Sequence, residues 1–113
     1  MAEPIPGRCL LILIARNEES FDPLATGLLD VGITGATVVD SKGLGAIIRE
    51  EMPMFAGLAA LLPRETGSRI LVSVTTRDRI EAVRAFIEEM KPAQRPIGAV
   101  LPIESTLGLP DET

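Results

Sequence analysis

The feature that most constrains the fold is a pair of short segments that are apolar at nearly every position. They are CLLILIA, residues 9 to 15, and ILVSV, residues 70 to 74, in which Ser73 is the polar exception. Each has the length of a β-strand and is far too short to span a bilayer. Since strand side chains alternate between two faces, strands of this kind need both faces of their sheet shielded from water.

Two amphipathic helices separate the predicted strands. Asp22 and Pro23 predict the N-cap and the first residue of one helix, and Gly32 predicts its end. The other helix is predicted to begin after a cap at Thr75 or Thr76. Its apolar stripe consists of Ile80, Val83, Phe86, Ile87 and Met90.

Two further strands complete the pattern. They are TGATVVDS, residues 34 to 41, and IGAVLPIES, residues 97 to 105, where Pro102 indicates an edge or a bulge. The order β-α-β, a long segment, then β-α-β predicts a ferredoxin-like βαββαβ fold of the α+β class, with a four-stranded antiparallel sheet and two helices on one face. We expect a single domain over residues 1 to 113, with a short flexible tail from about residue 108. The second apolar face of the sheet would stay exposed in a monomer, which predicts self-association.

Composition excludes several classes of function. The chain of 113 residues carries a formal charge of −5 and lacks histidine, tyrosine and tryptophan. An acidic chain is a poor ligand for nucleic acid, and without histidine it offers neither a histidine metal site nor a Ser-His-Asp triad. We therefore expect no metal, no catalysis and no nucleic acid. The leader MAEPIPGR lacks the features of a signal peptide, so we expect a cytoplasmic protein without membrane insertion.

One segment, LLDVGITGATVVDSKGLG at residues 28 to 45, closely resembles the PII signal-transduction proteins of nitrogen regulation. It matches their first helix, their second strand and the base of their T-loop, with the G-I-T-G-x-T and K-G-x-G patterns in register. Residues 70 to 90 are similar to the third strand and second helix of that family, and AVLPIES is similar to its fourth strand. The resemblance therefore covers nearly the whole chain.

The resemblance implies a non-enzymatic homotrimer that senses a small metabolite, an adenine nucleotide in the family, in clefts between subunits. No cofactor is required. The T-loop equivalent spans about residues 43 to 68, and residues 46 to 68 would regulate a target protein, either an enzyme or a membrane transporter. The alternative is a divalent-cation-tolerance trimer of the CutA type, which shares the fold. The K-G-x-G register and the absence of histidine speak against it.

The resemblance also implies a set of ligand-binding residues. One subunit would present Gly35, Ala36 and Thr37 to the adenine, and its neighbour would cradle the phosphates with the backbone of residues 43 to 45. Lys42 could swing into the cleft, and Arg95 could replace the lysine of the family's B-loop. The full candidate set is Gly35, Ala36, Thr37, Lys42, Gly43, Leu44, Gly45, Ser73 and Arg95.

The chain departs from the family where phosphates bind. KPAQRPIG stands in place of the B-loop pattern T-G-x-x-G-D-G-K, and the family's two C-terminal arginines fall at Gly108 and Pro110. Each loss removes charge-assisted hydrogen bonds, which predicts weak binding of a triphosphate. A nucleotide with fewer phosphates, another small ligand and no ligand at all stay open as alternatives.

The long segment also differs from the usual T-loop, because it lacks a tyrosine to receive a nucleotidyl group and contains the apolar stretch PMFAGLAALLP. Helical spacing there predicts a short helix packed on its own subunit or on a neighbour, with the apolar positions Met54, Leu58, Leu61 and Leu62. The alternative is a segment that binds the target protein. For that reading the candidate contacts are Met54, Phe55 and Leu58.

Overall fold

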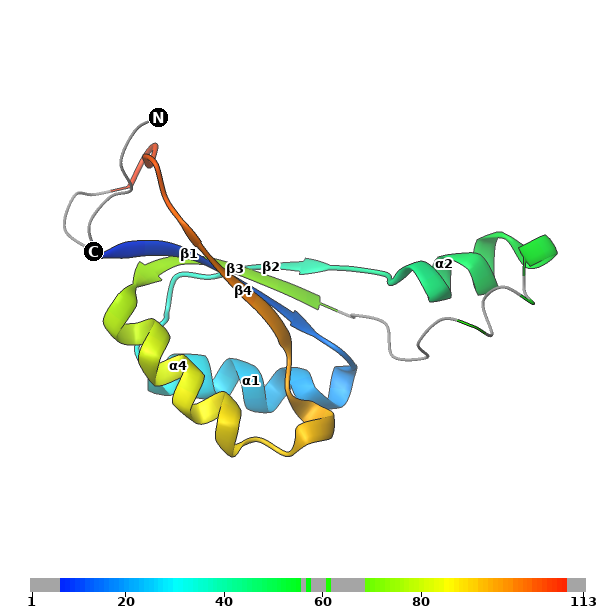
Figure 1. Ribbon diagram of the computed structural model, residues 1–113, viewed down its shortest axis with the longest axis horizontal. Helices are drawn as coiled ribbons and strands as arrows, with labels where there is room; N and C mark the ends of the chain where they lie inside the picture. Colours follow the sequence, from blue (N-terminus) through cyan, green and yellow to red (C-terminus); the bar gives the residue numbers. More distant parts are fainter. Residues whose placement is uncertain (1–6, 56, 58–60, 62–68, 110–113) are drawn as a thin grey trace.

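Figure 1 shows the computed structural model, which describes residues 7 to 55, 57, 61 and 69 to 109. Helices α1 and α4 lie together on one side of the sheet, and α2 extends away from it. The elements in chain order are β1 (Arg8–Ala15), α1 (Glu18–Asp30), β2 (Thr37–Asp40), α2 (Leu44–Glu51), the 3₁₀ turn η1 (Pro53–Phe55), β3 (Arg69–Thr76), α4 (Arg77–Glu89), the 3₁₀ turn η2 (Pro92–Gln94) and β4 (Ile97–Pro102).

The sheet has the strand order β2-β3-β1-β4, and every neighbouring pair is antiparallel. β1 pairs with β3 along its whole length, from Arg8 opposite Thr76 to Ala15 opposite Arg69. This arrangement confirms the predicted ferredoxin-like βαββαβ fold. β4 is an edge strand and Pro102 is its last residue, which confirms the position predicted from that proline.

The core lies between the sheet and the two helices. Alternate side chains of β1 point toward α1 and α4, and all are nearly inaccessible to water. The buried core cluster consists of Cys9, Leu11, Leu13, Ala15, Leu24, Leu28, Ile33, Leu71, Ile80 and Val83. The intervening side chains of the central strands face the other way, where neither α1 nor α4 reaches. This outer face carries Leu10, Ile12, Ile14, Ile70, Val72 and Val74.

Two glycines permit close packing in this core. A Cβ on Gly27 of α1 would lie 2.7 Å from the ring of Phe86 on α4, so this glycine lets the two helices approach each other. A Cβ on Gly98 of β4 would lie 2.6 Å from Leu13 Cδ2. Each glycine therefore leaves room for the side chain that faces it.

α1 begins earlier than the sequence predicted, because Asn17 rather than Asp22 is its N-cap. Asn17 Oδ1 accepts a hydrogen bond from the Ser20 backbone N–H at 2.9 Å, and the Ser20 hydroxyl donates to the Asn17 carbonyl at 2.9 Å. Glu18 and Glu19 in the first turn complement the helix dipole. Pro23 consequently lies inside the helix rather than at its first position.

The end of α1 agrees with the prediction. Gly32 has φ +88°, and its N–H donates to the Leu29 carbonyl while the N–H of Ile33 donates to Leu28. This pair of bonds is a Schellman motif, whose left-handed position favours glycine. Ile33 and Leu28 are both buried in the core, so the helix end is fixed by apolar contact as well as by hydrogen bonds.

The T-loop region differs most from the prediction. The helix α2 begins right after Gly43, where the sequence predicted none. Most of the stretch predicted to be helical, after Pro53, lies outside the described residues, and Gly57 within it is helical. Met54 and Leu61 are 89% and 80% exposed, so these two do not pack on their own subunit. Leu58 and Leu62 lie outside the described residues, as does most of the predicted flexible tail. In the described part of the chain, no helix is both long and apolar enough to cross a membrane.

The start of α1 can be tested by removing its cap. Asn17→Ala should lower the free energy of unfolding by about 1 kcal/mol, because the Ser20 N–H would lose its acceptor. Asp22→Ala is the matched control, since Asp22 is exposed, and its effect should stay within about 0.5 kcal/mol. Urea unfolding measures both variants. A larger loss for Asp22→Ala would contradict the observed helix start.

Candidate ligand-binding site

Part of the β3 edge has no neighbouring strand. β2 pairs with β3 only from Thr37 opposite Val72 to Asp40 opposite Arg69. Beyond Val72, the edge of β3 that faces away from β1 is unpaired within the described structure. The chain before Thr37 is held beside this edge by the Ser73 hydroxyl, which donates to the Gly35 carbonyl at 2.7 Å.

A cavity of about 400 Å³ lies along this edge, within the range of small-molecule sites. One wall is the free part of β3, and the opposite wall is the segment between α1 and β2. The remaining lining residues come from the first turn of α4 and from the C-terminal segment. The lining residues are Gly32, Ile33, Thr34, Gly35, Thr37, Val72, Ser73, Val74, Thr75, Arg79 and Leu109.

The wall opposite β3 is open at Gly35. A Cβ built on this glycine would meet no atom within 4 Å. The Schellman motif at Gly32 anchors the same wall to the core through Ile33. The cavity therefore combines a rigid start of the segment with free space beside its backbone.

Two cavity residues have unused polar groups. Thr75 is 5% exposed, and its Oγ1 has no hydrogen-bond partner among the described residues. A buried hydroxyl without a hydrogen-bond partner lowers the stability of the folded chain by about 1–3 kcal/mol. Arg79 lies across Gly32, because a Cβ on that glycine would be 3.2 Å from Arg79 Nε.

The structure brings three of the predicted site residues together, namely Gly35, Thr37 and Ser73. Ala36 is exposed and does not line the cavity. Lys42 and the glycines after it lie beyond the other end of β2, where α2 begins. Gly43 is the N-cap of α2, while Leu44 is exposed and Gly45 buried within its first turn.

Arg95 lies in a different place, at the end of α4. Its Nε donates to the Met90 carbonyl at 3.1 Å and its Nη2 to the Glu88 carbonyl at 2.7 Å. The guanidinium thus satisfies carbonyls that the helix end leaves free. Arg95 also borders a groove of about 580 Å³ between α4 and β4, whose floor includes Leu11 and Leu13. Within one chain it does not contribute to the cavity beside β3.

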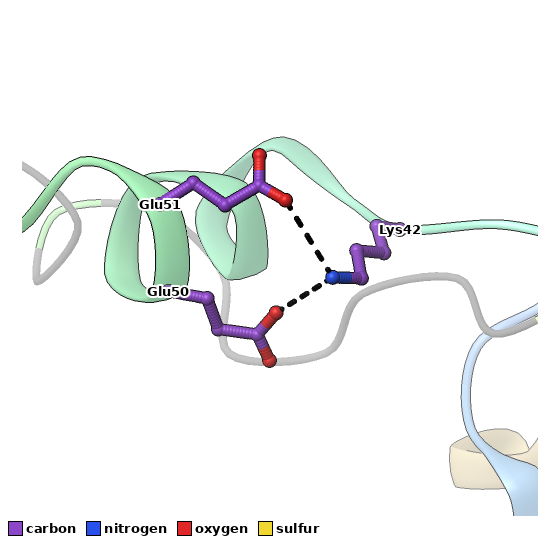
Figure 2. A network of polar contacts seen from close by, with 3 residues as sticks. All are labelled: Lys42, Glu50 and Glu51. Atoms are coloured by element: carbon purple, nitrogen blue, oxygen red, sulfur yellow. Dashed lines mark hydrogen bonds and ion pairs between the residues drawn. The ribbon is translucent and has the colours of Figure 1, made fainter.

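Lys42 is engaged by two carboxylates of α2, as Figure 2 shows. Its Nζ donates to Glu50 Oε2 at 2.9 Å and lies 3.8 Å from Glu51 Oε1. The hydrogen bond with Glu50 and the charges of both glutamates raise the pKa of Lys42 above its ordinary value of 10.5. All three side chains are more than half exposed, so the network is a surface brace between the start and the end of α2.

Sequence reasoning missed Thr75, Arg79 and Leu109 as cavity residues. The sequence offers Thr75 only as an alternative helix cap, and the actual cap is Thr76, whose Oγ1 accepts a hydrogen bond from the Arg79 N–H. Arg79 follows the polar pattern of any solvated helix face. Leu109 lies in the predicted tail. No signal in the sequence separates these residues from structural ones, because their roles depend on where the free β3 edge lies.

No protein-family model matches the sequence, and no curated protein matches it. Solved structures do resemble it. Arabidopsis thaliana PII bound to citrate has a TM-score of 0.58 and 20% identity, over 88% of this chain and 79% of that chain. The chain has a PII-like fold. The nitrogen regulatory PII-like protein CPII of Thiomonas intermedia K12, bound to ADP, AMP and bicarbonate, has a TM-score of 0.59 and 12% identity, over 95% of this chain and 100% of that chain.

The contact of Lys42 with the two glutamates of α2 has a measurable titration. In an NMR titration of lysine Cε signals, Lys42 should lose its proton only above pH 10.5, and Glu50→Gln should lower that midpoint more than Glu51→Gln. The reason is that Glu50 supplies the hydrogen bond as well as a charge. Because the folded pKa is raised, the brace persists below pH 10.5 and disappears as pH rises through the higher folded value. Equal effects of the two variants would contradict this geometry.

Proposed function

We propose that this chain is a non-enzymatic regulator of the PII type, which binds an adenine nucleotide in the cavity beside β3 and acts on a target protein through residues 46 to 68. The observation that carries the proposal is the position of that cavity. It is lined by Gly35 and Thr37, from the same segment that resembles the PII proteins in sequence, and by Ser73.

The free strand edge suits an adenine. The unpaired part of β3 offers backbone N–H donors and C=O acceptors, which normally pair with another strand. The Watson–Crick edge of adenine presents an amino donor beside a ring acceptor and can pair with such an edge in the same way. The open space at Gly35 lets the flat ring approach without meeting a side chain. The ADP and AMP bound to the Thiomonas protein agree with this ligand class.

The uncovered sheet face supports the trimer that the PII resemblance implies. Central side chains such as Ile12 and Val72 are only partly buried within one chain, and exposed apolar residues of the outer strands, Val39 and Ile97, lie beside them. Association through this face would remove the apolar surface from water. Ligand clefts between subunits would then combine the cavity of one chain with residues 42 to 45 or Arg95 of a neighbour.

The protruding segment supports a contact with a target protein. α2 extends away from the sheet, and Leu44, Met54 and Phe55 along this segment are 65%, 89% and 46% exposed. Amphipathic segments of this kind bind grooves on partners. The target is an enzyme or a membrane transporter, and the cytoplasm is the compartment in which we place the interaction.

Light scattering tests the assembly. The wild-type chain should have a mass three times the 12.1 kDa of one chain. Ile12→Glu should disrupt the trimer or unfold the chain, because it places a charge on the face that self-association would bury. Thr26→Glu, at an exposed position of α1, is the matched control and should stay trimeric. A monomeric wild-type protein at micromolar concentration would refute the trimer.

Calorimetry tests the ligand. Adenosine, AMP and ADP should bind, whereas ATP should bind no more tightly than AMP, because the lysine and arginines that hold the polyphosphate in the PII family are absent here. Gly35→Val should weaken the binding of all four, because it adds a branched side chain to the cavity wall without a clash at its Cβ, and Ala85→Val on the exposed face of α4 should not. If ATP binds more than about tenfold tighter than AMP, further phosphate contacts exist and the argument fails.

A further inference from the structure

The inner end of the cavity contains Thr75 and Arg79, to which the PII resemblance assigns no role. Thr75 is 5% exposed and lines the cavity, and its hydroxyl has no partner among the described residues. The neighbouring hydroxyl on the same face of β3, that of Ser73, is bonded to the Gly35 carbonyl. Thr75 therefore has an unused donor in the cavity wall, and because its oxygen is closed off from water, a ligand would reach it after a small shift of the neighbouring side chains.

Arg79 supplies a positive charge to the same cavity. Its side chain crosses Gly32, which has room for it because glycine lacks a Cβ. Within the described residues, no carboxylate pairs with the Arg79 guanidinium, in contrast to Arg69, which lies 3.7 Å from Asp40. Arg95 differs too, because backbone carbonyls occupy its donors. Guanidinium groups bind carboxylates and phosphates with paired, charge-assisted hydrogen bonds.

The orientation of α4 adds to this charge. The helix starts at Arg77, directly after Thr75 and the N-cap Thr76, so its positive dipole end lies at this end of the cavity. The dipole alone defines no site. Together with a buried free hydroxyl and an unpaired guanidinium, it makes the inner end of the cavity favourable for an anion.

We propose that Thr75 and Arg79 form an anion-binding subsite that accepts a small oxyacid, either a single phosphate or a carboxylate. Arg79 would pair with two oxygens of the anion, and the Thr75 hydroxyl would donate to one of them. This proposal rests on the proposed function, because it places the subsite in the adenine cavity. The acid group has two sources, the monophosphate of the nucleotide itself or a separate anion bound beside the nucleoside.

Calorimetry on the full chain separates these cases. The wild type should bind AMP about 10- to 100-fold more tightly than adenosine, the range expected for a charge-assisted hydrogen bond. Arg79→Gln should remove that difference and leave the affinity for adenosine unchanged. Arg84→Gln is the matched control, since Arg84 is on the same helix and pairs with Glu81 at the surface. It should keep the preference for AMP.

Thr75→Val gives an independent readout. Replacing the free hydroxyl by a methyl group should keep or raise the Tm, because it removes an unsatisfied buried donor. The same variant should lower the affinity for AMP and not for adenosine. A structural role for this hydroxyl would instead lower the Tm without changing the preference for AMP, and that result would overturn the assignment of Thr75.

Titrations of adenosine with added inorganic phosphate or bicarbonate identify the source of the anion. If adenosine binds more tightly in the presence of inorganic phosphate or bicarbonate, and only when Arg79 is intact, the anion is separate and the subsite is supported. Equal affinities for AMP and adenosine without such an effect would overturn it, as would a preference for AMP that survives Arg79→Gln.

A separate result would show that the proposed adenine site is wrong. If neither adenosine nor AMP binds, the proposed ligand is wrong, and the subsite is then tested with inorganic phosphate and bicarbonate alone. Saturable shifts of the Arg79 Nε–H NMR signal would support the subsite without the nucleotide. The absence of such shifts would overturn it.

Discussion

The structure depends on β1, a central strand that pairs along nearly its whole length on both edges and is apolar on both faces. Its bonds to β3 and β4 fix the register of the sheet, and Leu11 and Leu13 on its inner face hold α1 and α4 against that sheet. Because a shift of one residue would exchange the inner and outer side chains, this register is strongly specified by the buried face. The free β3 edge, and hence the cavity, lies where β2 stops pairing with β3, beyond Thr37 opposite Val72.

Sequence reasoning could predict the elements that periodicity determines. The strands, the apolar stripe of α4 and the Gly32 stop all follow from spacing or from one special backbone position. Sequence reasoning could not predict the start of a helix where two valid capping signals compete. Asp22 followed by Pro23 is a sound helix start, yet the reciprocal bonds of Asn17 and Ser20 begin the helix a turn and more earlier, and its interior tolerates the proline. α2 is not predicted, because the resemblance marks residues 43 to 68 as the equivalent of a T-loop rather than as a helix.

Only the part of the candidate site that lies in the segment matching the family pattern could be predicted from the sequence. Gly35 and Thr37 are found through a family pattern, and the structure places them beside Ser73 as the cavity wall. Thr75 and Arg79 carry no such pattern, because a threonine in a strand and an arginine in a first helical turn are ordinary surface chemistry. Their significance arises from the burial of one hydroxyl and from the lack of a paired carboxylate, which are properties of the folded chain.

The Schellman end of α1 has a consequence for the energetics of recognition. One wall of the cavity starts as the terminus of a core helix, with Ile33 buried and Gly32 hydrogen-bonded, so this wall is already ordered before any ligand arrives. A ligand there would lose little affinity to loop ordering, which is the usual benefit of preorganisation. Among the described residues of the arm that carries α2, Ile48 is buried but none belongs to this core cluster. Under the proposed function, the ligand would thus be bound against a wall that is fixed to the core, and the target would be bound by an arm outside that core.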